Sequence, residues 1–124
     1  MEIRVYYEDT DAGGVVYHSN YLNFCERARS EYFFNKGMTP VVDGAHFVVR
    51  KMECDFKKSA KFADLLEVTT EIKQIKGASF TIYHEVKKDN EVLFSANVLL
   101  ALAKDGRPLK LTEDLQSLLH SLFS

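Results

Sequence analysis

The sequence predicts one α+β domain over residues 1–124, in which a five-stranded antiparallel sheet packs against one long helix. Three observations predict this fold. A stripe of apolar residues at three- and four-residue spacing indicates a long helix in the first half of the chain. Four segments after it carry strand patterns separated by turn residues. A second helical stripe, in the last residues of the chain, indicates a short C-terminal helix.

The long helix is expected to run from Ser19 or Asn20 for about seventeen residues, until Gly37. Ser19 or Asn20 can cap its first turn, and Gly37 can supply the left-handed residue that ends it. The apolar stripe consists of Tyr21, Phe24, Cys25, Ala28 and Tyr32. A helix of this length is expected to be largely covered by protein.

Strands are expected at Ile3–Glu8, His46–Phe56, Leu66–Lys76, Ser79–Lys87 and Val92–Ala103. The last of them is apolar on both faces, which predicts a central place in the sheet. The turn signals Lys76-Gly77 and Asp89-Asn90 are short enough for hairpins.

One face of the second strand is expected to carry Val48, Arg50, Met52, Cys54 and Phe56. The C-terminal helix has Thr112 as its expected N-cap, and its stripe consists of Leu115, Leu118, Leu119, Leu122 and Phe123. One helix covers only one face of such a sheet. The other face and the edges of the sheet need partners, so we expect the chain to form oligomers.

The composition excludes several classes of protein. Sixteen basic and eighteen acidic residues give a net charge of −2, which disfavours a nucleic-acid binder. No apolar run has the roughly 18–20 residues of a transmembrane segment, and the first residues lack the pattern of a secretory signal. Cys25 and Cys54 are expected to be small buried residues in a reducing compartment, the cytoplasm. The scattered histidines predict no metal site, and no cofactor is expected.

The densest polar cluster joins the first strand to the long helix. It contains the acids Glu8, Asp9 and Asp11, the pair Gly13-Gly14, and His18. A helix N-terminus offers unpaired N–H groups and a partial positive charge, which can polarise a carbonyl oxygen while a carboxylate acts as base or nucleophile. The alternative is an acidic turn with a helix cap, and Glu8 and Asp9 are expected to be solvated turn residues, with Asp9 fixing the turn.

The string Y-x-x-x-D-x-x-G-V-V-Y-H-S-N-Y, from Tyr7 to Tyr21, resembles the signature of the 4-hydroxybenzoyl-CoA thioesterase family. It is most similar to the YbgC branch, acyl-CoA thioesterases linked to the Tol–Pal system. Residues 25–31, 55–60 and 64–68 extend the resemblance. It implies the hotdog fold, a sheet wrapped around one long helix and paired into homodimers or homotetramers. It also implies hydrolysis of acyl-CoA or of an acyl group on acyl carrier protein.

The resemblance assigns roles residue by residue. It places the catalytic carboxylate on Asp11 and the carbonyl-polarising backbone N–H on His18. The side chain of His18 could orient water, bond Asp11 or cap the helix. Whether Asp11 is nucleophile or general base stays open. The resemblance also favours Tyr7, whose hydroxyl could reach the same pocket. The substrate-binding residues expected at this end of the helix are Gly14, Val15 and Asn20, although helix capping explains Asn20 as well.

The phosphates of CoA need basic partners. Lys57, Lys58 and Lys61 belong to a basic stretch that starts at Arg50, and we expect them to bind phosphate. In the family, the turn from Lys76 to Ser79 is the position that contacts the nucleotide; with a single lysine there, an acyl carrier protein is an alternative donor of the acyl group.

Two other functions remain open. A hotdog-fold dehydratase would pair His18 with Asp11 to move protons on an acyl thioester. A non-catalytic module would bind an acyl thioester or a carrier protein, although a pure binder gains nothing from a carboxylate at Asp11.

Overall fold

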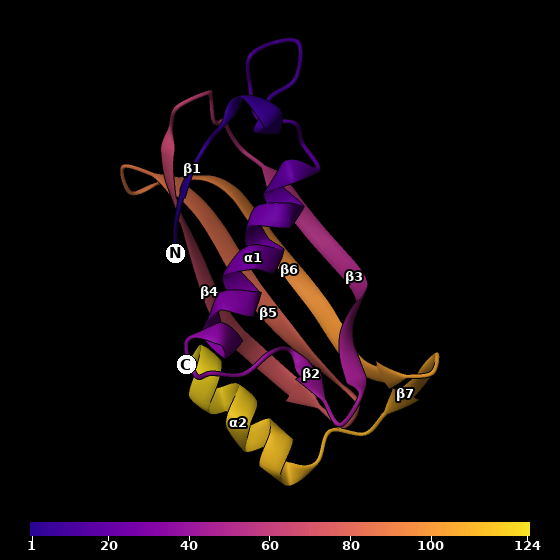
Figure 1. Ribbon diagram of the computed structural model, residues 1–124. Coiled ribbons are helices and arrows are strands. Elements are labelled where there is room, and N and C mark those ends of the chain that lie inside the picture. The colour runs from indigo at the N-terminus through magenta and orange to yellow at the C-terminus, as the bar shows by residue number, and fades with distance from the viewer.

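A computed structural model describes residues 1–124. A curved antiparallel sheet of seven strands lies against the helix α1, Asn20–Phe34, and the helix α2, Glu113–Phe123, packs below the C-terminal end of α1 (Figure 1). The strand order is β1-β4-β5-β6-β3-β2, with β7 paired to β6. The strands are β1 Glu2–Arg4, β2 Val41–Val42, β3 Ala45–Phe56, β4 Leu65–Lys76, β5 Ser79–Lys88, β6 Glu91–Lys104 and β7 Arg107–Leu109.

The predicted α+β architecture is confirmed, with two differences in its strands. The sheet has seven strands instead of five, because β2 and β7, of two and three residues, are too short to show an alternating pattern. The first strand ends at Arg4 instead of Glu8, since the chain turns into a single 3₁₀ turn, η1, at Tyr7–Asp9. No helix combines the length and the apolar character that crossing a membrane requires.

The predicted stripe of α1 faces the sheet. Tyr21, Phe24, Cys25 and Ala28 are buried, and the Tyr21 ring stacks on Phe94 of β6 with centroids 4.9 Å apart. Gly37 has a φ of +70°, as the predicted helix end requires. The predicted side-chain cap is wrong, because Ser19 makes no hydrogen bond to the first turn and the Asn20 amide contacts the side chains of Asp9 and Asn23.

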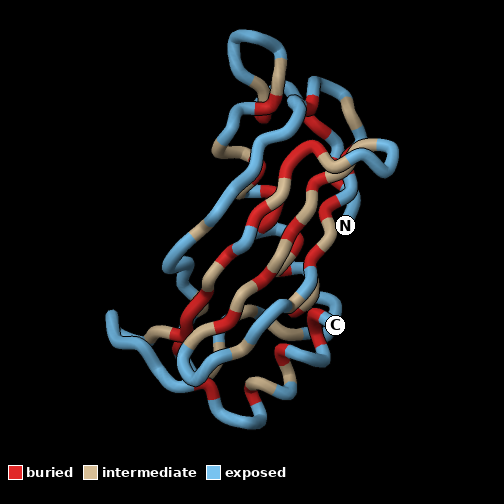
Figure 2. The backbone as a smooth tube through the Cα atoms, turned by 180° about the vertical axis from the view of Figure 1, so that it is seen from behind, coloured by how far each residue is buried: buried red, intermediate tan, exposed pale blue.

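The hydrophobic core lies between α1 and the inner face of β4, β5 and β6. Buried residues alternate with less buried ones along the strands, as the view from behind shows (Figure 2). The central place of β6 is confirmed. Asp89 and Asn90 both have positive φ, which fits the predicted hairpin between β5 and β6. Thr112 caps α2 as predicted, since its hydroxyl accepts the Leu115 N–H at 3.2 Å.

β3 forms a long edge of the sheet. β2 pairs with only its first two residues, so the strand is unpaired on that side from Phe47 onward. A bulge between Val49 and Lys51 shifts the alternation, so the predicted shared face of Val48, Arg50 and Met52 is wrong. Instead Phe47 contacts the core rings of Phe33 and Phe80, and it shares the inner face with Val49, Met52, Cys54 and Phe56.

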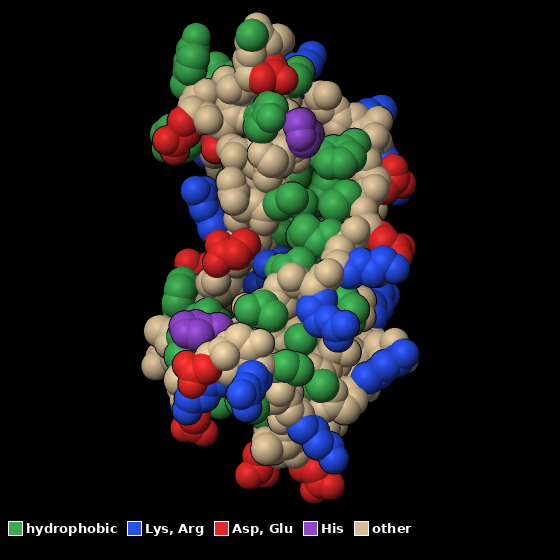
Figure 3. All heavy atoms as spheres, turned by 90° about the vertical axis from the view of Figure 1, so that its right-hand side faces the viewer, with side chains coloured by type: hydrophobic (Ala, Val, Ile, Leu, Met, Phe, Trp, Pro, Cys, Tyr) green, Lys and Arg blue, Asp and Glu red, His purple; other side chains and the backbone are tan.

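The helix leaves part of this inner face of β3 uncovered. Val49 is 46% exposed and Phe56 52% exposed, and hydrophobic side chains gather on the surface where α1 meets β3 (Figure 3). Cys54, predicted to be buried, is exposed for the same reason, whereas Cys25 is fully buried as predicted.

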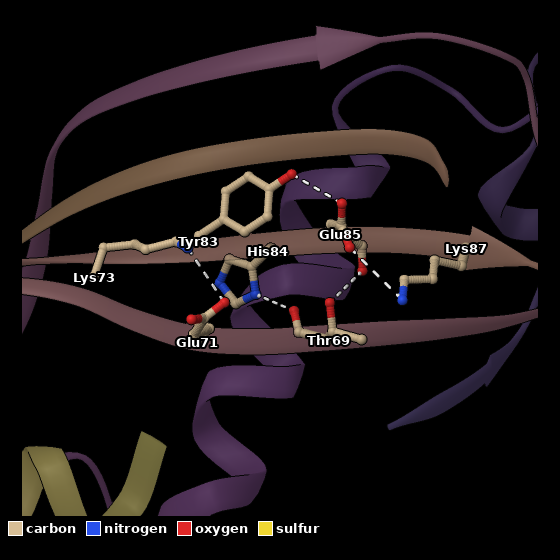
Figure 4. Close-up of polar contacts among 7 residues, drawn as sticks. All are labelled: Thr69, Glu71, Lys73, Tyr83, His84, Glu85 and Lys87. Carbon is tan, nitrogen blue, oxygen red and sulfur yellow. Dashed lines mark hydrogen bonds and ion pairs between the residues drawn. The ribbon is translucent and has the colours of Figure 1, made fainter. Parts of the chain in front are cut away.

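The outer face of the sheet is polar. On β4 and β5, Lys73 pairs with Glu71 at 3.4 Å, Lys87 pairs with Glu85 at 3.7 Å, and the Tyr83 hydroxyl donates to Glu85 at 2.9 Å (Figure 4). These contacts are typical of a solvated surface.

Candidate functional site

The loop between η1 and α1 is a tight hairpin, residues 10–16, that projects beyond one end of the sheet (Figure 1). The Asp11 N–H donates to the Val15 carbonyl at 2.9 Å, and the Gly14 N–H donates to the Asp11 carbonyl at 3.0 Å. Gly14 has a φ of +79°, which the turn requires and which glycine adopts without strain. The Val16 N–H donates to the Ala60 carbonyl at 2.9 Å and so fixes the hairpin to the rest of the domain.

Asp11 lies on this hairpin with its carboxylate exposed. One carboxylate oxygen, Oδ1, accepts the Gly13 N–H at 2.8 Å, and Oδ2 makes no hydrogen bond within the chain. The residue borders a surface hollow of about 320 Å³, the Asp11 hollow. Its lining residues are Asp11, Val15, Val16, His18, Tyr21, Phe56, Lys57, Lys58 and Ser59.

His18 stands two residues before the start of α1. Its backbone N–H makes no hydrogen bond within the chain, so a donor next to the positive end of the helix is available. The His18 ring contacts Tyr17, with centroids 4.4 Å apart, and the edge of Phe56. The ring makes no hydrogen bond to Asp11 and does not cap the helix.

Asp9 has a structural role in this loop that the sequence patterns predicted only in part. It is only 6% exposed; its Oδ2 accepts the Tyr6 N–H at 2.8 Å and its Oδ1 accepts the Asn20 side-chain amide at 2.7 Å. The prediction of a solvated residue is wrong, whereas its role in fixing the turn is confirmed. Asn20, expected to bind substrate, uses its amide for this contact and accepts from Asn23 at 3.0 Å.

Tyr7 and Gly14 lie beside the Asp11 hollow, on the outer side of the hairpin. The Tyr7 side chain is 79% exposed and its ring meets the edge of Phe62 at 5.7 Å. Together with Asp11 these residues border a second hollow of about 520 Å³. The structure therefore places Tyr7 close to the Asp11 loop without burying its hydroxyl.

The predicted phosphate-binding residues divide into two groups. Lys57 and Lys58 line the Asp11 hollow, and Lys58 forms an ion pair with Glu91. Lys61 lies just outside it, where its backbone pairs with Val15. Lys76 and Ser79 lie at the opposite end of the sheet, since the twelve residues of β4 span about 36 Å. Within one chain the turn from Lys76 to Ser79 does not reach the site.

The chain is similar in sequence to known thioesterases. A sequence model of the Thioesterase superfamily matches residues 13–95. Acyl-CoA thioesterase YbgC of Haemophilus influenzae is 38% identical over 126 residues, covering 97% of this chain and 93% of that protein. The protein of the same name from Helicobacter pylori is 45% identical over 86 residues, covering 69% of this chain and 65% of that protein.

A probable thioesterase from Bartonella henselae, solved by crystallography, has the same fold. It superposes with a TM-score of 0.85 at 37% identity, covering 90% of this chain and 97% of that chain. The resemblance identified in the sequence is confirmed, and it covers nearly the whole chain.

Proposed function

Because the chain belongs to the Thioesterase superfamily and has its hotdog fold, we propose that it hydrolyses the thioester bond of acyl-CoA at the Asp11 hollow. One observation carries the proposal: Asp11, whose carboxylate is exposed, and His18, whose backbone N–H is unpaired, line the same hollow near the N-terminus of α1. Relatives named acyl-CoA thioesterase at 38% and 45% identity support the choice of substrate.

In this mechanism the thioester carbonyl oxygen accepts a hydrogen bond from the His18 N–H. The partial positive charge of the α1 N-terminus stabilises the negative charge that develops on that oxygen. Asp11 then acts in one of two ways. It attacks the carbonyl carbon, displaces the CoA thiolate and forms an anhydride that water hydrolyses, or it takes a proton from a water molecule that attacks directly.

The CoA phosphates are proposed to lie near Lys57 and Lys58. Lys57 makes no ion pair within the chain and is free to bind a phosphate, whereas Lys58 would first separate from Glu91. An acyl group carried on acyl carrier protein presents the same thioester and would use the same residues around Asp11. Lys61 would add a positive charge at the rim of the Asp11 hollow.

We also propose that two copies pair through the β3 edge. This edge combines unpaired backbone groups with the partly exposed side chains Val49 and Phe56, which a second copy would cover. The turn at Lys76–Ser79 can approach a hollow only on another copy. A homotetramer through the outer sheet face would have to bury the charged pairs of Glu71 and Glu85, so the dimer is the assembly we favour. The two free cysteines suit a reducing compartment such as the cytoplasm.

The test is the Asp11→Asn variant with a panel of acyl-CoAs of different chain length and one aromatic acyl-CoA. Free-thiol release should fall by about 10²–10⁴-fold, because an amide can neither attack nor accept the proton. Circular dichroism should show an unchanged fold. Asp114→Asn, which removes an exposed carboxylate on α2, is the matched control and should keep the parental rate. Hydrolysis by Asp11→Asn at the parental rate would rule out this assignment.

The same panel separates the other two functions. A dehydratase would leave a saturated acyl-CoA intact, and a binding module would release no thiol from any of them. Label found in the Asp11 carboxylate after a single turnover in heavy-oxygen water would identify Asp11 as the nucleophile, since label enters there only when water attacks the Asp11 carbonyl of an anhydride. Trapping the anhydride covers the case in which water attacks the acyl carbon instead.

A further inference from the structure

Tyr21, on the first turn of α1, carries a buried hydroxyl group beside the Asp11 hollow. The side chain is only 3% exposed, and it is part of the lining of the hollow. Its hydroxyl oxygen accepts the Ala60 N–H at 3.0 Å, so this end of the ring lies against the peptide that joins Ser59 to Ala60. Because Ser59 also lines the hollow, the hydroxyl lies at the wall of the hollow and not in the middle of the core.

The hydroxyl proton of Tyr21 has no acceptor within the chain. The bond from Ala60 uses a lone pair of the oxygen and leaves the O–H group available as a donor, and this side chain makes no other hydrogen bond. The Tyr83 hydroxyl, in contrast, donates to Glu85 at 2.9 Å. Buried donors normally have partners, and an unpaired one destabilises the fold. The free proton therefore points to a group that enters the hollow.

The acid whose charge reaches Tyr21 does not take this proton. Asp64 accepts the Lys61 N–H at 2.8 Å and forms an ion pair with Lys88 at 2.9 Å. Burial, and to a smaller extent the charge of Asp64, raises the pKa of the Tyr21 phenol, although the Ala60 N–H opposes this rise. The phenol therefore keeps its proton at neutral pH and remains a hydrogen-bond donor.

The Tyr21 hydroxyl is held in a fixed position. Its ring stacks on Phe94 with the centroids 4.9 Å apart, and it meets the edge of Phe56 at 5.9 Å. Side chains on an α-helix lean toward the helix N-terminus, so the phenol and the backbone N–H of His18, three residues earlier, serve the same end of α1. A donor that is already oriented loses little freedom when a substrate binds, and such donors are the ones that stabilise a developing charge.

We propose that Tyr21 is a further catalytic residue, whose hydroxyl donates a second hydrogen bond to the thioester carbonyl oxygen beside the bond from the His18 N–H. That oxygen has two lone pairs and becomes negative in the transition state, so both bonds strengthen as the charge develops. The proton stays on the phenol throughout, and Asp11 keeps its role as nucleophile or base. This inference rests on the proposed hydrolysis at the Asp11 hollow.

The first experiment measures thiol release from an acyl-CoA by Tyr21→Phe. The kcat should fall by about 10²–10³-fold, the usual effect of removing one donor to an oxyanion, and KM should change little because the bond is strongest in the transition state. Tyr83→Phe removes a hydroxyl from the outer face of the sheet; it is the matched control and should keep the parental kcat. A Tyr21→Phe variant that is folded by circular dichroism and has the parental kcat would overturn the proposal.

The second experiment detects the hydrogen bond itself and needs no turnover. An acyl-CoA with an isotope-labelled thioester carbonyl is bound to Asp11→Asn, and infrared difference spectroscopy gives the stretching frequency of that carbonyl. A hydrogen bond lowers this frequency, so adding Tyr21→Phe should raise it. Because Tyr21→Phe also leaves the Ala60 N–H without its acceptor, fluorotyrosine in place of Tyr21 is the milder variant. It keeps that bond, and its more acidic phenol should lower the frequency further. An unchanged frequency in both variants would overturn the proposal.

The two experiments separate this inference from the proposed hydrolysis. If the parent releases thiol and Asp11→Asn does not, a parental rate in Tyr21→Phe overturns the role of Tyr21 alone. A parent that releases no thiol from any acyl-CoA overturns the hydrolysis and, with it, the catalytic role of Tyr21. In that case the infrared frequency still decides whether the hydroxyl binds the carbonyl of a bound thioester.

Discussion

The neutral, buried imidazole of His84 couples the stability of the folded chain to pH. Its pKa is lowered to about 3 in the folded state, against about 6.5 in an unfolded chain. The unfolded chain therefore binds a proton that the folded chain does not, throughout the range between these two values. The neutral His84 therefore contributes fully to the stability of the folded chain above about pH 6.5, and this contribution is lost progressively as the pH falls toward 3.

This behaviour is measurable by urea unfolding between about pH 7 and about pH 4. The free energy of unfolding should fall by up to about 1.4 kcal/mol per pH unit through this residue, in addition to any other titration. The profile of His84→Gln should be flatter, and that of His120→Gln, which changes an exposed histidine, should follow the parent. Parallel profiles for the parent and His84→Gln would contradict the prediction.

Asp9 and Asp11 show what a local pattern can and cannot predict about single residues. The motif from Tyr7 to Tyr21 is enough to select Asp11, because its spacing carries the family resemblance. The burial of Asp9 depends on the side-chain amide of Asn20, which arrives eleven residues later through the fold of the loop. No periodicity within the loop reveals that contact, so Asn20 was expected at the substrate instead.

At the scale of the elements, the two glycines of the Asp11 hairpin are required for different reasons. A Cβ at Gly13 would lie 3.2 Å from Oδ1 of Asp11, whereas a Cβ at Gly14 would meet no atom within 4 Å. Gly14 instead has a left-handed φ of +79°, which costs other residues about 1–2 kcal/mol.

We therefore expect two different outcomes from alanine. Gly13→Ala should lower kcat by about tenfold or more with a small change in stability, because it displaces the Asp11 carboxylate. Gly14→Ala should lower the free energy of unfolding by about 1–2 kcal/mol, with the smaller loss of kcat. Thiol-release kinetics and urea unfolding of both variants check this, and a larger kcat loss in Gly14→Ala would contradict it.

The elements also differ in how well the sequence predicts them. α1 follows from its own spacing, since the apolar stripe of a helix needs no information from other segments. In β3 the residues Phe47, Val48 and Val49 are all apolar, so either alternation fits the strand. The pairing with β6 decides between them through the bulge before Lys51, and that pairing is a tertiary contact.

For the whole molecule, the free edge of β3 is the most consequential surface. We expect the chain to sediment at twice its 14.2 kDa. Val49→Lys would place a charge on the inner face of that edge and should shift the mass to that of one chain. Glu2→Lys on β1, the opposite edge, is the matched control and should leave the mass unchanged. A parental chain that sediments as a monomer would contradict the proposed pairing.

For the whole molecule the sequence predicts the order of strand, long helix and further strands, and it predicts that Asp11 and His18 lie at the same end of the sheet. It does not predict that Lys76 and Ser79 lie at the opposite end of the sheet, because that placement follows from the full length of β4, about 36 Å. A nucleotide contact at that turn is a property of an assembly and not of one chain.

The unequal burial of the two thiols makes thiol labelling a probe of the β3 edge. Cys25 is fully buried and its thiol pKa is raised to about 12, so it should resist alkylation. Cys54 is exposed in one chain, but it stands on β3 between Val49 and Phe56, the side chains that a second copy would cover. Mass spectrometry should therefore find Cys54 labelled in separated chains and protected while two copies are paired.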